Sequence, residues 1–258
     1  MDVIFSLLTP AGFAAAAIIT VVASFVKGAT GFAMPMIMIS GMASFLDADL
    51  ALAMLIIPTL AANLYQALGD GIGAAWGSAR LYWRYLTIVL LFIAGSAQLV
   101  AILHKSVMFL ILGIPITGFA ILLLSGVKFV IPPHRRLLAD LGIGGFAGFF
   151  GGISGVWGPP TVAFLTGIGA NKNDSVRIQG VIYGAGAVVL TLSHLRSGVL
   201  NAQTIPLSVS MLLPMVLGLW IGISARNRMD EAKFRHWTLI TLVVVGLNLI
   251  RRGVVGLI

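Results

Sequence analysis

Long apolar segments follow one another along nearly the whole chain, separated by short polar breaks. A helix needs about 20 apolar residues to cross a hydrocarbon core of roughly 30 Å. Six segments meet this requirement and predict membrane-spanning helices: Leu50–Leu68, Tyr85–Leu103, Val107–Val130, Val176–Leu195, Thr204–Ser224 and Phe234–Ile250. The pattern therefore predicts an all-α integral membrane protein.

Two further apolar segments, Ala11–Ser44 and Leu137–Gly167, are too long for a single crossing without a strong tilt. Glycine and proline interrupt both of them. The interruptions read KGATGFAMP over residues 27–35 and GGISGVWGPP over residues 151–160. Each segment is therefore predicted to form two half-helices around a central break.

The two breaks match each other in sequence. A shift of 124 residues superimposes four positions without a gap: Gly28 on Gly152, Thr30 on Ser154, Gly31 on Gly155 and Pro35 on Pro159. The same shift lays the other spans of the first half over those of the second. The chain is therefore predicted to contain two repeats, 1–124 and 125–258, and internal repeats of this size are typical of transporters.

The composition agrees with a lipid-facing surface. The chain is 59% hydrophobic and 9% charged, whereas soluble domains carry roughly 25% charged residues. Its net charge of +8 comes from Lys and Arg that lie singly or in pairs between apolar runs. This scatter suits helix ends at a membrane surface and argues against a nucleic-acid partner. The absence of cysteine excludes disulfides, thiol chemistry and Cys-based metal sites, and no cofactor is expected.

The distribution of Lys and Arg predicts the topology, because these residues concentrate on the cytoplasmic side. If both broken segments cross the membrane, the basic residues other than Lys27 divide eight against seven. If both enter and return on one side, they divide eleven against four. The eleven are Arg80, Arg84, Lys128, Arg135, Arg136, Lys172, Arg177, Arg226, Arg228, Lys233 and Arg235.

The second division is the expected asymmetry. The prediction is therefore six full spans plus two re-entrant hairpins, about 11–44 and 137–167, arranged as two inverted repeats. Both termini then lie outside the cytoplasm of a cell inner (plasma) membrane. No Lys or Arg precedes the first apolar run, so the N-terminal segment is assigned to the mature fold rather than to a signal peptide. The pairs Arg135-Arg136 and Arg251-Arg252 are interpreted as charges that set the topology.

The breaks are the candidate binding site. Non-helical backbone inside a membrane is tolerated where it lines a cavity, and a helix that restarts at a proline presents free N–H groups that favour an anion. Thr30 and Ser154 would add hydroxyl donors. Lys27 is the one ionisable residue deep in an apolar segment, and it is either a charge partner for the anion or a side chain that reaches to the interface. The substrate-binding residues predicted at the breaks are Lys27, Gly28, Ala29, Thr30, Gly31, Phe32, Gly152, Ser154, Gly155, Val156 and Trp157.

The span after each break carries further polar candidates, of which Asn63, Gln179 and Tyr183 are assigned to the site. Such side chains either line the path or bond neighbouring helices. The acidic residues and the four histidines all fall in loops or near segment ends. Transporters commonly carry protons through intramembrane carboxylates or histidines. The hypothesis is therefore uniport or exchange of an anion.

The Gly-rich break in each half, Gly28-Ala29-Thr30-Gly31-Phe32 and Gly152-Ile153-Ser154-Gly155 with Gly158-Pro159 after it, resembles the TauE/SafE sulfite exporters, also described as toluene-sulfonate uptake permeases. The resemblance covers essentially the whole chain at the level of layout. It implies a membrane carrier, not an enzyme, for sulfite, organosulfonates or related anions. The bulky Trp157 and the charged Lys27 stand where the resemblance leads one to expect small residues.

Two other functions are consistent with the sequence. An anion channel could also be built from re-entrant hairpins. A rhomboid-like intramembrane serine protease would use Ser154 in Gly152-Ile153-Ser154-Gly155, with His194 as the candidate base. The expected partners are a small anion, membrane lipid and a second copy of the chain in a homodimer.

Overall fold

The computed structural model describes residues 7–126, 130–170, 172–225 and 231–257. These ranges contain helices and no strand. The first half of the chain forms α2 (Pro10–Thr30), α3 (Met34–Met42), α4 (Ala48–Leu68), α5 (Ile72–Leu81), α6 (Trp83–Ser96), η1 (Ala97–Ala101) and α7 (Lys105–Leu124). The second half forms η2 (Pro133–Arg135), α8 (Arg136–Ser154), α9 (Gly158–Gly167), α10 (Lys172–Ser197), α11 (Thr204–Ser210), α12 (Leu212–Ala225) and α13 (Glu231–Val255).

Each of the six predicted spans is largely helical in its described residues. Five of them overlap helices that are long and apolar enough to cross a membrane, whereas Phe234–Ile250, in α13, does not fall in such a helix among the described residues. The third span ends early, because α7 stops at Leu124 and Gly126 adopts a left-handed conformation with φ 66° that ends the helical geometry. Among the described residues, seven helical segments are long and apolar enough to cross a membrane. They are Pro10–Thr30, Ala48–Leu68, Trp83–Ala101, Lys105–Leu124, Pro133–Ser154, Arg177–Ser197 and Thr204–Ala225. The chain is a multi-pass membrane protein.

Both long apolar segments contain the predicted break, but their arms are unequal. The first arms, α2 and α8, have 21 and 19 residues, and the second arms, α3 and α9, have 9 and 10. The prediction of two half-helices was therefore wrong for the first arms, since 21 residues rise by about 31 Å. The reason is that each helix continues through Gly28 or Gly152 and ends only at Gly31 or Gly155.

Each first arm ends in the same way. Gly31 and Gly155 adopt left-handed conformations, with φ 84° and 72°, and each N–H donates over 2.7 Å to the carbonyl of Lys27 or Gly151, four residues earlier. A glycine in this conformation is a common helix terminator, since it has no Cβ to clash. The two breaks differ two residues later. Ala33 in the first break is also left-handed, with φ 73°, whereas the matching Trp157 in the second break has φ −112°.

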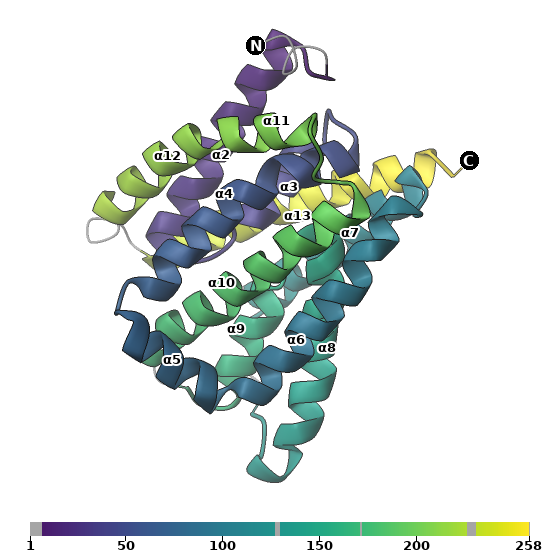
Figure 1. The fold of residues 1–258 in the computed structure, drawn as a ribbon. Coiled ribbons are helices and arrows are strands. Elements are labelled where there is room, and N and C mark those ends of the chain that lie inside the picture. Colours follow the sequence, from purple (N-terminus) through teal and green to yellow (C-terminus); the bar gives the residue numbers. More distant parts are fainter. Residues whose placement is uncertain (1–6, 127–129, 171, 226–230, 258) are drawn as a thin grey trace.

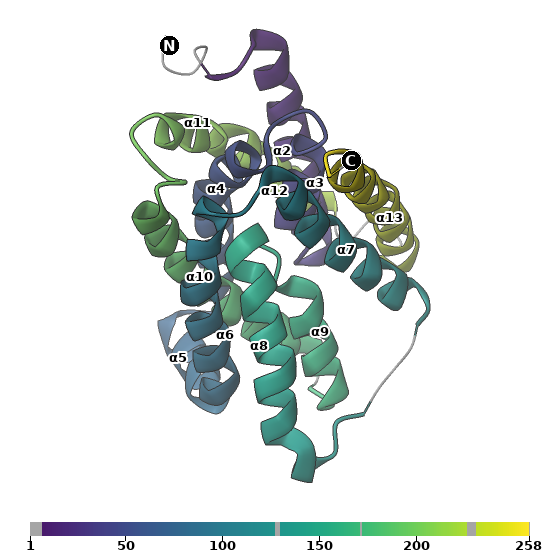
Figure 2. The same ribbon diagram turned by 90° about the vertical axis from the view of Figure 1, so that its right-hand side faces the viewer.

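The chain reverses direction at both breaks (Figure 2). On the first side, a Cβ built at Gly41 in α3 would lie 3.0 Å from the Ile19 side chain in α2. On the second side, the last residue of α9, Gly167, accepts a hydrogen bond of 2.7 Å from the N–H of Ile131, shortly before α8. Each second arm therefore runs back toward the end of the molecule from which its first arm came.

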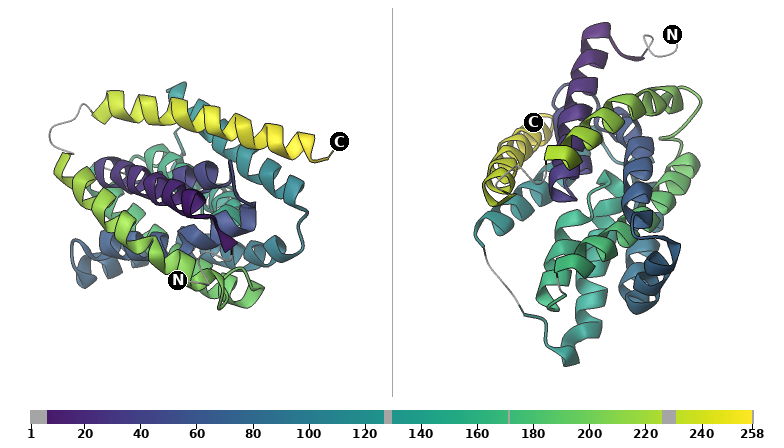
Figure 3. Two further views of the ribbon diagram at one scale, coloured as in Figure 1. Left: turned by 90° about the horizontal axis from the view of Figure 1, so that it is seen from above. Right: turned by 90° about the vertical axis from the view of Figure 1, so that its left-hand side faces the viewer.

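Helices from the two halves of the chain pack against each other. The main pairs are α2 with α12, α6 with α8, α4 with α10, and α7 with α13. Seen from above, α2 lies between α12 and α13 (Figure 3). The breaks at the ends of α2 and α8 consequently lie inside the bundle, whereas the start of α2 and the end of α13 lie toward one end of it (Figure 1).

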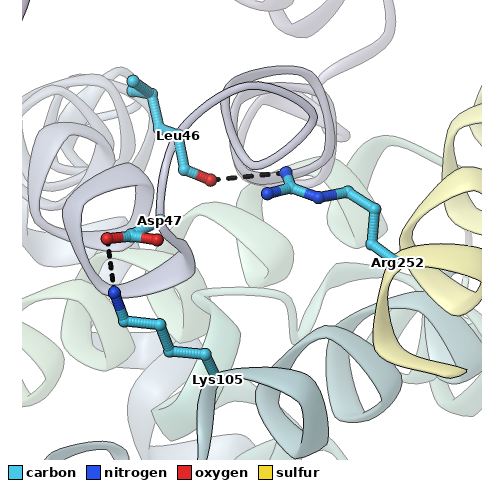
Figure 4. Close-up of polar contacts among 4 residues, drawn as sticks. All are labelled: Leu46, Asp47, Lys105 and Arg252. Carbon is cyan, nitrogen blue, oxygen red and sulfur yellow. Dashed lines mark hydrogen bonds and ion pairs between the residues drawn. The ribbon is translucent and has the colours of Figure 1, made fainter. Parts of the chain in front are cut away.

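The end of α13 is tied to the α3–α4 turn (Figure 4). The guanidinium of Arg252 donates to the carbonyls of Ala43 and Leu46, and it lies 4.2 Å from the centre of the Phe109 ring. In the same region Lys105 forms an exposed ion pair of 2.6 Å with Asp47. Arg252 is therefore more than a topology charge, because it donates to carbonyls at both ends of the turn between α3 and α4.

Replacing Arg252 with methionine is expected to lower the stability of the protein by about 1.5–3 kcal/mol, the usual contribution of hydrogen bonds to a charged group. The matched control is Arg251→Met, because Arg251 is exposed and, among the described residues, bonds only to Asn248 on its own helix. Thermal unfolding in detergent measures both variants. Equal losses for Arg251→Met and Arg252→Met would contradict this role of Arg252.

Candidate functional site

The two breaks share one cavity. Phe32, Ala33, Pro35 and Met36 line it from the first break, and Gly155, Val156, Trp157, Gly158 and Pro159 line it from the second. Lys27, Asn63 and Tyr183 complete the lining from α2, α4 and α10. Its volume is about 20 Å³, which accommodates a water molecule. This conformation therefore holds the two breaks closely around a small space, to which Lys27, Asn63 and Tyr183 contribute the polar side chains.

Lys27 is the charged residue of this cavity. Its side chain is 4% exposed, and its ammonium donates to the amide oxygens of Asn63 and Gln66 over 2.6 and 2.8 Å. The ring of Tyr183 lies 5.8 Å from Nζ. The interpretation that Lys27 reaches out to the membrane interface is therefore wrong for this structure, because the side chain points inward to α4 and α10.

Lys27 has no anionic partner in the described part of the chain. Ion pairs there join Lys105 to Asp47 and Arg136 to Asp140, and neither involves Lys27. An ammonium has three donors, of which two are used by amide oxygens. A buried charge without a counter-ion is costly, so the site is electrostatically suited to an anion that would supply the missing charge.

The hydroxyls of Thr30 and Ser154 serve the breaks themselves. Thr30 donates to the carbonyl of Val26 over 2.8 Å, and Ser154 donates to that of Phe150 over 2.6 Å. Their oxygens also accept from the N–H groups of Phe32 and Val156. In this conformation the expected role as hydroxyl donors to a guest is not seen, because the hydrogens are directed to the helix.

The breaks offer fewer backbone donors than the sequence suggested. The N–H groups of Gly31 and Gly155 bond back into their helices. The first turn of α9 contains Pro159 and Pro160, which have no N–H, so Gly158 contributes the one donor before Thr161. The positive ends of α3 and α9 still face the cavity, but the full charge on Lys27 dominates its field.

Gly28 and Gly152 pack helices together and do not line the cavity. A Cβ at Gly28 would lie 2.6 Å from the Leu219 carbonyl oxygen in α12. A Cβ at Gly152 would lie 2.5 Å from that of Ile93 in α6. Gly28 and Gly152 therefore match in sequence because each allows a close contact between two helices, α2 with α12 and α8 with α6. These contacts position the ends of α2 and α8. Ala29 is buried beside Gly28 and is also absent from the lining.

Gln179 and Gln66 adjoin the cavity lining. The Tyr183 hydroxyl donates to the carbonyl of Gly158 over 3.2 Å and contacts the Gln179 amide oxygen at 3.4 Å. Gln66 was not assigned to the site from the sequence, although its spacing of three residues from Asn63 places both on one face of α4. Ala33 and Met36 were missed because apolar side chains carry no chemical signal in an apolar segment.

A family model for sulfite exporters of the TauE/SafE type matches residues 16–249, which is nearly the whole chain. The chain belongs to the TauE/SafE family. This family consists of membrane transporters for sulfite and related anions. Comparison with curated proteins and with solved structures found no match.

The geometry gives no support to the serine protease alternative to a TauE/SafE transporter. His194 is fully buried, and its Nε2 lies 2.9 Å from the Gly152 carbonyl oxygen, whereas the Ser154 hydroxyl bonds to Phe150. The serine–histidine hydrogen bond that such an enzyme uses is therefore not formed here.

Two titratable groups lie deeper than their positions near helix ends suggested. His194 is 0% exposed and Asp140 is 3% exposed. Asp140 pairs with Arg136 over 3.2 Å within α8. The sequence argued against proton coupling because the acidic residues and histidines lie near the ends of apolar segments. The burial of His194 and Asp140 weakens this argument. A flux measurement must therefore include proton movement.

Proposed function

We propose that this TauE/SafE protein is a secondary carrier for a small oxyanion, with sulfite or an organosulfonate as substrate, and that the anion binds between the two helix breaks beside Lys27. The observation that carries the proposal is the buried ammonium of Lys27, which has two neutral amide partners and no carboxylate partner among the described residues. A bound anion would neutralise this charge and accept its remaining donor.

The arrangement around Lys27 favours an anion without fixing one geometry. Sulfonate and sulfite groups present several acceptor oxygens, which suit one ammonium donor and the positive ends of two short helices. Trp157, Phe32 and Tyr183 add aromatic walls that could contact the organic part of a sulfonate. Because the cavity is about 20 Å³ in this conformation, substrate entry requires the breaks to separate.

We further propose that the two halves are inverted repeats and that α2–α3 and α8–α9 are re-entrant hairpins. Corresponding helix ends support the repeat: Thr30 and Ser154, Met34 and Gly158, and Ala48 and Lys172 are each 124 residues apart. The exchange of partners also supports it, since α2 packs on α12 of the other half and α8 packs on α6. The site would then open to alternate sides of the membrane when the α2–α12 pair rocks against the α6–α8 pair around it.

The proposed orientation places both termini outside the cytoplasm. The start of α2 and the end of α13 lie toward one end of the bundle, whereas the α5–α6 junction and the start of α8 lie toward the other end (Figure 1). Arg84 and Arg136 belong to the first turns of α6 and α8. The basic end would face the cytoplasm by the positive-inside tendency. Residues 127–129 and 226–230, which include predicted cytoplasmic charges, lie outside the described residues.

Flux in proteoliposomes tests the proposal. With a panel of sulfite, sulfate, toluenesulfonate and acetate, saturable flux is expected for at least one sulfur anion, faster when the opposite side contains the same anion. A pH-sensitive dye inside the vesicles records proton movement, which uniport or exchange does not require. No flux above empty vesicles would contradict the carrier proposal, and unitary currents in a bilayer would indicate a channel instead.

A further inference from the structure

A second cavity of about 230 Å³ lies between the α5–α6 junction and the first turns of α8, far larger than the one at the breaks. The α5–α6 junction and the start of α8, which line it, lie at the end of the molecule opposite the start of α2 (Figure 1). Its lining residues are Leu81, Tyr82, Trp83, Arg84, Tyr85, Arg136 and Asp140. The transport site does not include any of them.

The charged groups of this cavity leave one positive charge unmatched. The Nε atom of Arg136 lies 3.2 Å from a carboxylate oxygen of Asp140, which is 3% exposed, so this pair is neutral together. Arg84 forms no ion pair among the described residues and lies 5.6 Å from the Trp83 ring. The net charge of +1 matches the single negative charge of a phosphodiester.

The cavity also offers hydrogen-bond donors that the described protein does not use. The guanidinium of Arg136 lies 5.5 Å from the Tyr82 ring and 4.7 Å from the Phe164 ring, so aromatic side chains hold its plane. Within the described ranges, its terminal nitrogens have no acceptor, and neither does the guanidinium of Arg84. Two arginines with free planar donors are suited to the oxygens of a phosphate group.

The rim of the cavity is apolar and exposed. Leu81 is 73% exposed and Trp83 is 57% exposed. The adjoining turns of α8 expose Leu138 and Leu141 by 68% and 51%. In a membrane protein such surfaces contact lipid, and tryptophan and tyrosine gather at the level of the headgroups. A soluble anion would make no use of this rim, whereas acyl chains would cover it.

We propose that this cavity is a binding site for the phosphodiester headgroup of a membrane phospholipid. The phosphate oxygens accept from Arg84 and from the terminal nitrogens of Arg136, and the acyl chains descend over Leu81, Leu138 and Leu141. Basic pockets at the ends of transmembrane helices are known to bind anionic headgroups in this way. A lipid bound there would contact both α6 and α8. The packing of these two helices positions the second break, at the end of α8.

Native mass spectrometry of the full chain in detergent tests the site with dioleoyl phosphatidylglycerol as the probe. Wild-type protein is expected to retain the lipid, and Arg84→Gln to weaken its binding about fivefold, the effect of one arginine at a lipid headgroup. Arg80→Gln is the matched control, since Arg80 is exposed on the last turn of α5 and does not line the cavity. It is expected to bind lipid like the wild type.

Two further arms identify the ligand. Dioleoylglycerol, which lacks the phosphate, is expected not to bind, and inorganic phosphate at equal concentration is expected not to displace the lipid. The double variant Arg136→Gln with Asp140→Asn removes the second arginine without leaving a buried carboxylate, and is expected to weaken binding further. Equal losses in Arg80→Gln and Arg84→Gln, binding of dioleoylglycerol, or displacement by inorganic phosphate would each overturn the proposal. None of these results depends on transport.

Discussion

Lys27→Met is expected to raise the KM of anion flux strongly while leaving the protein folded. The loss of one charge-assisted hydrogen bond in a buried site is worth about 1.5–3 kcal/mol, or roughly a 10- to 100-fold loss of affinity. Stability is expected to change little, because the variant also removes a buried charge that has no carboxylate partner in the described part of the chain. A buried charge without an opposite charge is costly, so its removal offsets the loss of the hydrogen bonds to Asn63 and Gln66.

The concentration dependence of flux in proteoliposomes measures this effect as a rise in KM, together with thermal unfolding of the same preparations. Lys105→Met is the matched control, because Lys105 is an exposed lysine whose partner is Asp47 and which lies outside the cavity. Its flux is expected to equal that of the wild type. If the Lys27→Met variant transports with an unchanged KM, Lys27 does not bind the anion. If the variant unfolds, the role of Lys27 is structural.

Gly222→Ala is expected to destabilise the protein by about 1–3 kcal/mol, the usual cost of overpacking, and to reduce flux. A Cβ at Gly222 would lie 2.2 Å from the Phe25 carbonyl oxygen, and one at Gly218 would lie 2.2 Å from that of Val21. These small residues four apart let α12 approach α2 closely, as is common between membrane helices. Because Lys27 lies two residues after Phe25 in α2, displacement of this helix would also move the ammonium.

Gly118→Ala is the control for this substitution, because a Cβ at Gly118 in α7 meets nothing within 4 Å. It is expected to be neutral or slightly stabilising, since alanine is favoured over glycine in a helix by about 1 kcal/mol. Thermal unfolding and flux are measured for both variants. Similar unfolding temperatures for Gly118→Ala and Gly222→Ala would show that the close α2–α12 contact contributes little.

The position and character of the helices could be predicted from the sequence, because they depend on local signals. Apolar runs of sufficient length marked five of the seven helices that could cross a membrane, and α2 and α8 were predicted as half-helices instead. The glycines with following prolines marked both places where the chain leaves the helix. Lys27 was recognisable because a charge inside an apolar segment is rare and costly. The family resemblance rested on the same two motifs and was confirmed by the match over residues 16–249.

The roles of single residues within those motifs depended on packing. The sequence could not distinguish the roles of the glycines within each break. Gly28 and Gly152 pack against α12 and α6. Gly31 and Gly155 end the helices. Likewise, the burial of His194 follows from its contact with Gly152, 42 residues earlier. Position along one helix does not reveal what lies beside it.

Hydropathy and backbone preferences act over a few neighbouring residues, so a helical membrane protein with two matched interruptions and one intramembrane lysine could be predicted from the order of residues alone. The contacts of Lys27 with Asn63 and Gln66 on α4 and with Tyr183 on α10, and the cavity that both interruptions line, became visible in the folded chain. The physical reason is that these contacts join segments distant in the chain, and they form only when the helices of the two halves pack together.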